Sequence, residues 1–231
     1  PSDGFLAMQF QEGAQAYSRV DTITVDDVYG LQLTLRPGVT GLRFLGAILV
    51  GNDLQVTGQI PMTVGLNTVQ LPAESTVEDM YIADVGIEYT VDEWLIACEY
   101  RVIVGDIDVL IDASGVGFGM IPAVQQVRSD GAYVQVAYRI DERWEVGSYY
   151  GVYFGNRNDR EGNNQVAAGN PDWYAWQRDL AVSLRCDIND FWIVKIEGHY
   201  LNGVSMLSPT ENPDGYEENW FLFAAKTTMS F

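Results

Sequence analysis

Polar and apolar residues alternate along most of the chain, and apolar positions at helical spacing are rare. Successive side chains of a β-strand point to opposite sides, so a period of two predicts strands. In 133–140, for example, Val134, Val136 and Tyr138 oppose Gln135 and Arg139. The alternation predicts eleven strands, at 5–17, 28–36, 42–50, 54–60, 79–89, 94–104, 131–140, 144–154, 173–186, 191–201 and 219–231.

The connections between the predicted strands fall into two classes. Tight turns are predicted at 51–53, 91–93, 141–143 and 187–190, and long polar loops at 61–78, 105–130, 155–172 and 202–218. A soluble β-sandwich also has alternating strands. Short turns at one rim and long loops at the other are instead typical of outer-membrane barrels. The connections therefore favour a barrel in lipid.

The six tryptophans give a second argument for lipid. All of them fall near the ends of predicted strands: Trp94, Trp144 and Trp192 follow tight turns, whereas Trp173, Trp176 and Trp220 follow long loops. Amphipathic rings gather at the two lipid–water boundaries of a membrane protein. We therefore interpret the six residues as an aromatic girdle, with three at each rim.

The final strand, 219–231, is apolar on one face, mixed on the other, and ends in Phe231. It resembles the closing strand of Gram-negative outer-membrane barrels, in which a terminal aromatic residue is part of the assembly signal. The predicted fold class is all-β: an antiparallel transmembrane β-barrel that forms a single domain over residues 1–231. Its expected location is the cell outer membrane of a Gram-negative bacterium.

The predicted strand count is odd, whereas bacterial single-chain barrels usually have an even number. A twelfth strand at 63–69 would correct the count. The alternative, which we favour, is that further N-terminal strands lie upstream of this chain. The chain would then be the C-terminal portion of a larger barrel with up to about 16 strands.

Composition narrows the partners. The 231 residues include 13 basic and 32 acidic side chains, a net charge of −19, which argues against a nucleic-acid partner. The mean hydropathy of −0.04 fits a soluble protein and a lipid-facing barrel equally, because outward apolar residues alternate with inward polar ones. Cys98 and Cys186 both occupy apolar strand positions, and we expect free thiols.

Three segments carry a resemblance to a known group: Gly131–Trp144, Trp176–Arg185 and Trp192–Tyr200, followed by the terminal Phe231. Over 80–231 the chain is similar to the C-terminal half of porin-like proteins, in the broad superfamily that includes the phosphate-selective porins. The resemblance implies a water-filled barrel, often a homotrimer, that contacts outer-membrane lipid. Its implied function is the passive diffusion of small hydrophilic solutes or ions.

A porin works through the charges and width of its lumen, without covalent chemistry. Strand parity places these charged residues on the inward face: Arg36, Arg43, Asp84, Glu88, Glu99, Arg101, Arg139, Glu145, Asp179, Arg185, Lys195, Glu197 and Lys226. Three interpretations remain open. Acids and bases could pair, as Glu99 with Arg101 or Lys195 with Glu197. Acidic loops could favour cations, or the bases could conduct anions.

Other features leave alternatives. The apolar, glycine-rich loop 105–130 either folds inward to narrow the pore or extends the preceding strand above the membrane. His199 is the only histidine, and its parity places it inward beside Glu197 as a wall residue. We expect no catalytic residue, metal or cofactor. The alternative function is a structural, anchoring barrel whose lumen is plugged or occupied by a protein partner.

Overall fold

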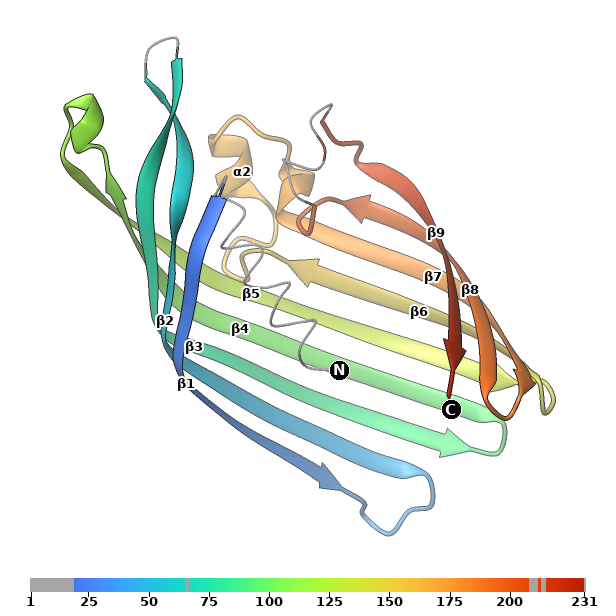
Figure 1. Ribbon diagram of the computed structural model, residues 1–231. Coiled ribbons are helices and arrows are strands. Elements are labelled where there is room, and N and C mark those ends of the chain that lie inside the picture. Colours follow the sequence, from blue (N-terminus) through green and yellow to red (C-terminus); the bar gives the residue numbers. More distant parts are fainter. Residues whose placement is uncertain (1–18, 65–66, 208–211, 213–214, 231) are drawn as a thin grey trace.

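The structure is a computed structural model that describes residues 19–64, 67–207, 212 and 215–230. In this part of the chain nine strands form one antiparallel sheet, and each strand pairs with its neighbours in sequence (Figure 1). The strands are β1 (Arg19–Leu35), β2 (Leu42–Val64), β3 (Asn67–Val91), β4 (Trp94–Asp112), β5 (Met120–Arg139), β6 (Trp144–Phe154), β7 (Trp176–Asn189), β8 (Trp192–Gly203) and β9 (Asn219–Met229).

The two ends of the sheet differ in their connections. At one end, which we call the short-turn end, the strands are joined by residues 36–41, 92–93, 140–143 and 190–191. At the other, the long-loop end, lie long hairpins and three short helical segments: η1 (Ser114–Val116), α2 (Asn163–Ala167) and η2 (Asp172–Ala175). Figure 1 shows this asymmetry along the sheet. The predicted contrast between the two rims is therefore present.

No helix in the described part of the chain has both the length and the apolar character needed to cross a membrane. The prediction of an all-β, antiparallel architecture is confirmed. The predicted strand at 5–17 and the terminal Phe231 lie outside the described residues. From 144 onward the predicted strands agree with β6 to β9 to within a few residues, except that η2 forms the first part of the predicted 173–186 strand.

The N-terminal half differs more from the prediction. The predicted strands at 42–50 and 54–60 are a single strand, β2, so the tight turn expected at 51–53 is wrong. Asp53 takes a left-handed conformation (φ 49°) without reversing the chain. The expected loop at 61–78 is also wrong, because β2 and β3 stay paired from Leu42–Tyr89 to Val64–Asn67.

A bend crosses β1, β2 and β3 at residues 26–27, 52–53 and 78–79. Gly51 and Leu54 line one cavity together with Val77 and Met80, although regular alternation would place each pair on opposite faces. The pairing of β3 with β4 slips at the same level, between Val77 and Met80. An extra residue in a strand bends it and increases its twist. The bend therefore explains why turn-like residues occur inside long strands.

The segment 105–130 is a hairpin extension and does not fold inward. Asp106–Asp112 continues β4, and Met120–Val127 begins β5, with η1 at the tip between them. The buried apolar cluster of Leu54, Val56, Val77 and Ile107 lies in this extended part of the sheet, with Met80, Val109 and Val127 packed against it. Of the two alternatives for this segment, strand extension is confirmed and an inward constriction is wrong.

Candidate functional site

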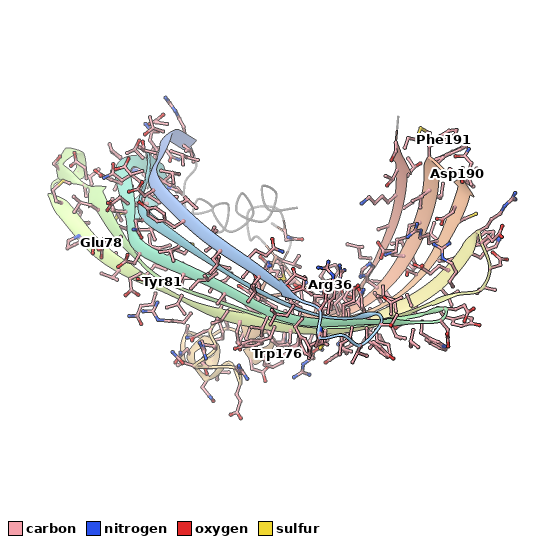
Figure 2. All side chains as sticks on the ribbon, turned by 90° about the horizontal axis from the view of Figure 1, so that it is seen from below. Arg36, Glu78, Tyr81, Trp176, Asp190 and Phe191 are labelled. Atoms are coloured by element: carbon pink, nitrogen blue, oxygen red, sulfur yellow. The ribbon has the colours of Figure 1, made fainter. Side chains whose placement is uncertain are left out.

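The sheet is curved like a trough, and its two faces differ in chemistry. Figure 2 shows Arg36 on the concave side and Trp176 on the convex side. Because side chains alternate, the register then places the remaining residues of the short-turn half. Charged residues lie on the concave face, and large exposed apolar residues such as Leu180, Val182 and Phe223 lie on the convex face.

The concave face carries a row of ion pairs between neighbouring strands. Arg43 of β2 donates to Glu88 of β3 at 2.5 Å, and the two residues are register partners. Arg101 of β4 donates to its register partner Asp84 and lies 3.6 Å from Glu99. Glu99 and Arg101 therefore meet, as the pairing interpretation allowed, although Asp84 is the nearer partner.

A second group of charges lies on β5 to β8. Arg139 contacts Glu145 at 3.7 Å and Asp187 at 2.8 Å, and Arg185 contacts the same Asp187 at 2.7 Å. Asp187 was predicted to lie in a turn, yet β7 continues through it to Asn189. Asp187 therefore lies on the concave face, where its carboxylate is shared by two guanidinium groups. Lys195 and Glu197 are 2.8 Å apart, as the pairing interpretation allowed.

His199 lies on the concave face, as its parity predicted, but its partner is not Glu197. Its Nδ1 atom is 3.0 Å from the Asp179 carboxylate, and the Tyr149 hydroxyl donates to the same carboxylate. The His199 side chain is 12% exposed and that of Asp179 is 19% exposed. The three groups form a half-buried cluster across β6, β7 and β8, with no serine or cysteine in these contacts to act as a nucleophile.

The concave charges balance in number. Seven basic residues (Arg36, Arg43, Arg101, Arg139, Arg185, Lys195 and Lys226) face seven acidic ones (Asp84, Glu88, Glu99, Glu145, Asp179, Asp187 and Glu197). Five of the basic residues form ion pairs, whereas Arg36 and Lys226 form none within the described part of the chain. Pairing across and along strands is therefore the arrangement that the structure displays.

On β1 to β3 the same face becomes apolar toward the bend. A cavity of about 150 Å³ opens at the bend, lined by Val25, Val28, Leu49, Gly51, Leu54, Val77, Met80 and Ile82. Residue parity alone could not place these side chains, because the bend reverses the alternation. On β1 to β3 the concave face is thus charged near the short turns and apolar at the bend, whereas on β6 to β8 the charges continue to Asp179 and His199.

On the convex face, four of the six tryptophans occupy outward positions of the sheet. Trp94 packs on Tyr138 with ring centroids 4.7 Å apart, and the Trp192 indole donates to Thr227 at 2.7 Å. Trp144 and Trp176 share this face at opposite ends of the strands. Trp220 is different: it pairs with Leu201 on the concave side, so its assignment to the outward girdle is corrected.

Two remaining expectations concern cysteines and metals. Cys98 and Cys186 are free thiols, as predicted. Within the described residues no cluster of three or more histidine, cysteine, aspartate or glutamate side chains could hold a metal ion. Trp173, the sixth girdle tryptophan, lies in η2 and packs edge-on against Tyr174.

Comparison with solved structures finds outer-membrane proteins. The NanC porin shares 13% identity at a TM-score of 0.42, over 92% of this chain and 98% of that one. The CymD monoaromatic hydrocarbon channel shares 12% sequence identity at a TM-score of 0.49, over 99% of this chain and 63% of that one. OmpT of Vibrio cholerae, in its outer-membrane expressed form, shares 15% sequence identity at a TM-score of 0.43, over 90% of this chain and 62% of that one. The chain thus spans nearly all of NanC but less than two thirds of CymD and OmpT.

No family model matches the sequence, and no curated protein sequence matches it. A specific relation to phosphate-selective porins is not among the findings.

Proposed function

We propose that the chain forms part of the wall of an outer-membrane β-barrel channel through which small hydrophilic solutes or ions diffuse passively. The observation that carries the proposal is the opposition of the two faces: exposed apolar side chains cover the convex side, and paired charges cover the concave side. A soluble sheet would bury its apolar face and expose its charges to solvent. A pore wall has its apolar face in lipid and its charges in water.

The dimensions of the convex face support a membrane location. Trp176 and Cys186, the register partner of Trp144, are ten residues apart on β7. At about 3.3 Å per residue this is about 33 Å along the strand, and a tilt of about 40° leaves about 25 Å along the membrane normal. The apolar band of outer-membrane barrels is also about 25 Å tall. The two tryptophans therefore stand at the right separation for the two lipid–water boundaries.

The free edges of the sheet support a closed barrel. Among the described strands, β1 and β9 each pair on one side, so each presents a row of unpaired N–H and C=O groups. Lipid offers no hydrogen-bonding partner, and each unsatisfied group there costs several kcal/mol. We therefore infer that these two edges are paired in the assembled protein.

The balanced charges of the concave wall support weak ion selectivity. A wall with as many acidic as basic residues produces little net field, whereas the whole chain carries −19. The excess of acidic residues lies off this wall, where its effect reaches about 8–10 Å in physiological salt. We propose a slight preference for cations. Trimeric assembly, which the porin resemblance implies, belongs to the same proposal, as does the absence of catalysis.

Single-channel recording in a planar bilayer tests the proposal. Discrete, long-lived conductance steps are expected, with a reversal potential under a salt gradient that indicates a small cation preference. A reversal potential of anion-selective sign would contradict the charge argument. Silence from a folded, heat-modifiable barrel would contradict the open pore and favour the alternative of an anchoring barrel with an occupied lumen.

A further inference from the structure

Four arginines gather on the convex side of the sheet at its long-loop end. Arg128 lies on β5, Arg178 on β7, and Arg157 and Arg160 in the segment between β6 and α2. We call these four residues the arginine patch. They are notable in a chain that has only 13 basic residues against 32 acidic ones. Seven further basic residues face the concave wall, so the patch contains most of the remaining positive charge.

Two of these arginines lie over aromatic rings that face outward. The guanidinium carbon of Arg160 is 5.0 Å from the Phe154 ring centroid, and that of Arg178 is 5.1 Å from the Trp176 ring. Phe154 and Trp176 are register partners on adjacent strands. Both rings continue the apolar surface of the convex face, and Figure 2 shows α2 on the same side, near Trp176. The patch therefore lies directly at the edge of the apolar band.

Two acidic residues, Asp130 and Asp106, hold the patch in place. Asp130 is 2% exposed and accepts hydrogen bonds from Tyr100 at 2.9 Å and from Arg160. Arg128 lies 2.7 Å from Asp106 and also donates to the carbonyl oxygen of Gly105. Arg128 and Arg160 are thus fixed by neighbouring acidic groups, and the contact of Arg160 with Asp130 anchors the loop segment to the outer surface of β5.

Arg157 and Arg178 are exposed and form no ion pair within the described residues. The backbone N–H of Arg157 donates to the Arg128 carbonyl oxygen at 2.6 Å, which holds it beside the patch. The nearby Asp159 carboxylate accepts from the backbone N–H groups of residues 163 and 164, so it is already engaged in the start of α2. Glu161 and Asp172 are the other acidic residues of this segment.

We propose that the arginine patch binds the phosphate groups of membrane lipid headgroups at the long-loop boundary. A planar guanidinium bonds phosphate through two parallel N–H groups, and a ring beneath it favours this geometry. Phosphates of membrane lipids lie at the level where the apolar band ends, which is where these side chains lie. The inference rests on the membrane location proposed above.

The test compares two double variants with the wild-type chain. Arg157→Gln with Arg178→Gln removes the two unpaired guanidinium groups, and Arg19→Gln with Arg143→Gln removes two exposed arginines outside the patch. The probe is fluorescent diphosphorylated lipid A, titrated into folded protein in a non-ionic detergent. Loss of two charge-assisted contacts should weaken binding by the patch variant about tenfold or more, while the control variant matches wild type.

Two further arms identify the source of the phosphate. Both double variants should bind dephosphorylated lipid A with the same affinity as the wild-type chain. Millimolar inorganic phosphate should not displace the phosphorylated lipid from the wild-type chain. Displacement by inorganic phosphate would replace the lipid proposal with a site for free anions. Equal lipid binding by wild type and the patch variant would overturn the proposal outright.

The membrane location is checked separately, by flotation of the wild-type protein with phosphatidylcholine vesicles. Flotation together with equal lipid A binding by all variants would refute only the arginine patch. Failure of the wild type to float would refute the membrane location itself. Far-UV circular dichroism of each variant confirms that its sheet has formed.

Discussion

Val182→Arg is the substitution that separates a lipid-facing sheet from a water-facing one. Val182 lies near the middle of β7 on the convex face and is 61% exposed. An arginine at the midplane of an outer-membrane barrel costs about 2–4 kcal/mol. On a water-exposed surface the same replacement changes the free energy of unfolding by no more than about 0.5 kcal/mol. The structure therefore predicts a loss of about 2–4 kcal/mol in the free energy of unfolding.

Ser183→Arg is the matched control, because the next residue points to the concave wall. Its register partners are Gly147 and Glu197, so a new guanidinium there meets water and a carboxylate. The expected change in the free energy of unfolding is within about 1 kcal/mol. Both variants are measured by urea titration in lipid vesicles, with tryptophan fluorescence as the signal. Equal costs for the two variants, or a greater cost for Ser183→Arg, would refute the assignment of faces.

Three other substitutions test particular contacts. Asp187→Asn removes one negative charge from the wall, so the permeability ratio in a planar bilayer should shift toward anions, by up to about twofold, whereas Glu142→Gln in a turn should leave it unchanged. In Asp141 the carboxylate accepts from two backbone N–H groups of its own turn, which lowers its pKa. That stabilisation is present above the unfolded pKa of about 3.9 and is lost as the pH falls through the folded pKa. In acid unfolding scans the Asp141→Asn variant should therefore lose less stability than the wild-type chain. Gly203→Ala should lower the free energy of unfolding by about 3 kcal/mol, because φ is +86° and a Cβ would lie 2.2 Å from a carbonyl oxygen at the start of β7. In the same urea titration the control Gly38→Ala, where φ is +71° and no atom lies within 4 Å of the added Cβ, should lower it by about 1 kcal/mol.

The C-terminal half could be predicted from the sequence because its strands obey a strict period of two. Between Trp144 and Gly203 the side chains keep their faces along each strand, apart from a register shift between Asp187 and Asn189. Parity therefore placed Arg185, Lys195 and His199 on the correct side. Their partners were harder to predict, since a contact between strands depends on the register and not on parity.

The N-terminal half could not be predicted in the same way, because its turn-like residues bend strands without ending them. Gly51, Asn52 and Asp53 have the chemistry of a hairpin turn, yet β1 and β3 continue on both sides of β2 and hold the chain extended. The bend also reverses the alternation, so Leu54 and Val77 face inward against the parity of the preceding residues.

The face occupied by Trp220 and the strand position of Asp187 could not be predicted from the neighbouring residues alone. Trp220 follows a long loop, as a girdle residue should, but proximity to a rim does not determine which face a side chain occupies. Asp187 stands among turn residues, and only the continuation of β7 to Asn189 reveals that it joins two arginines on the wall. The contact of Arg160 with Asp130 on the convex side likewise depends on the segment after β6, which folds back over the sheet.

A labelling scan along β7 tests the central claim most directly. Single cysteines are introduced in turn at Leu180, Ala181, Val182, Ser183 and Leu184 in a chain without its two native cysteines, and each is labelled with an environment-sensitive fluorophore in lipid vesicles. We expect the results to alternate: brominated lipids should quench the fluorophore at 180, 182 and 184, and aqueous iodide should quench it at 181 and 183. Equal access of both quenchers at all five positions would contradict a strand with lipid on one side and a water-filled lumen on the other.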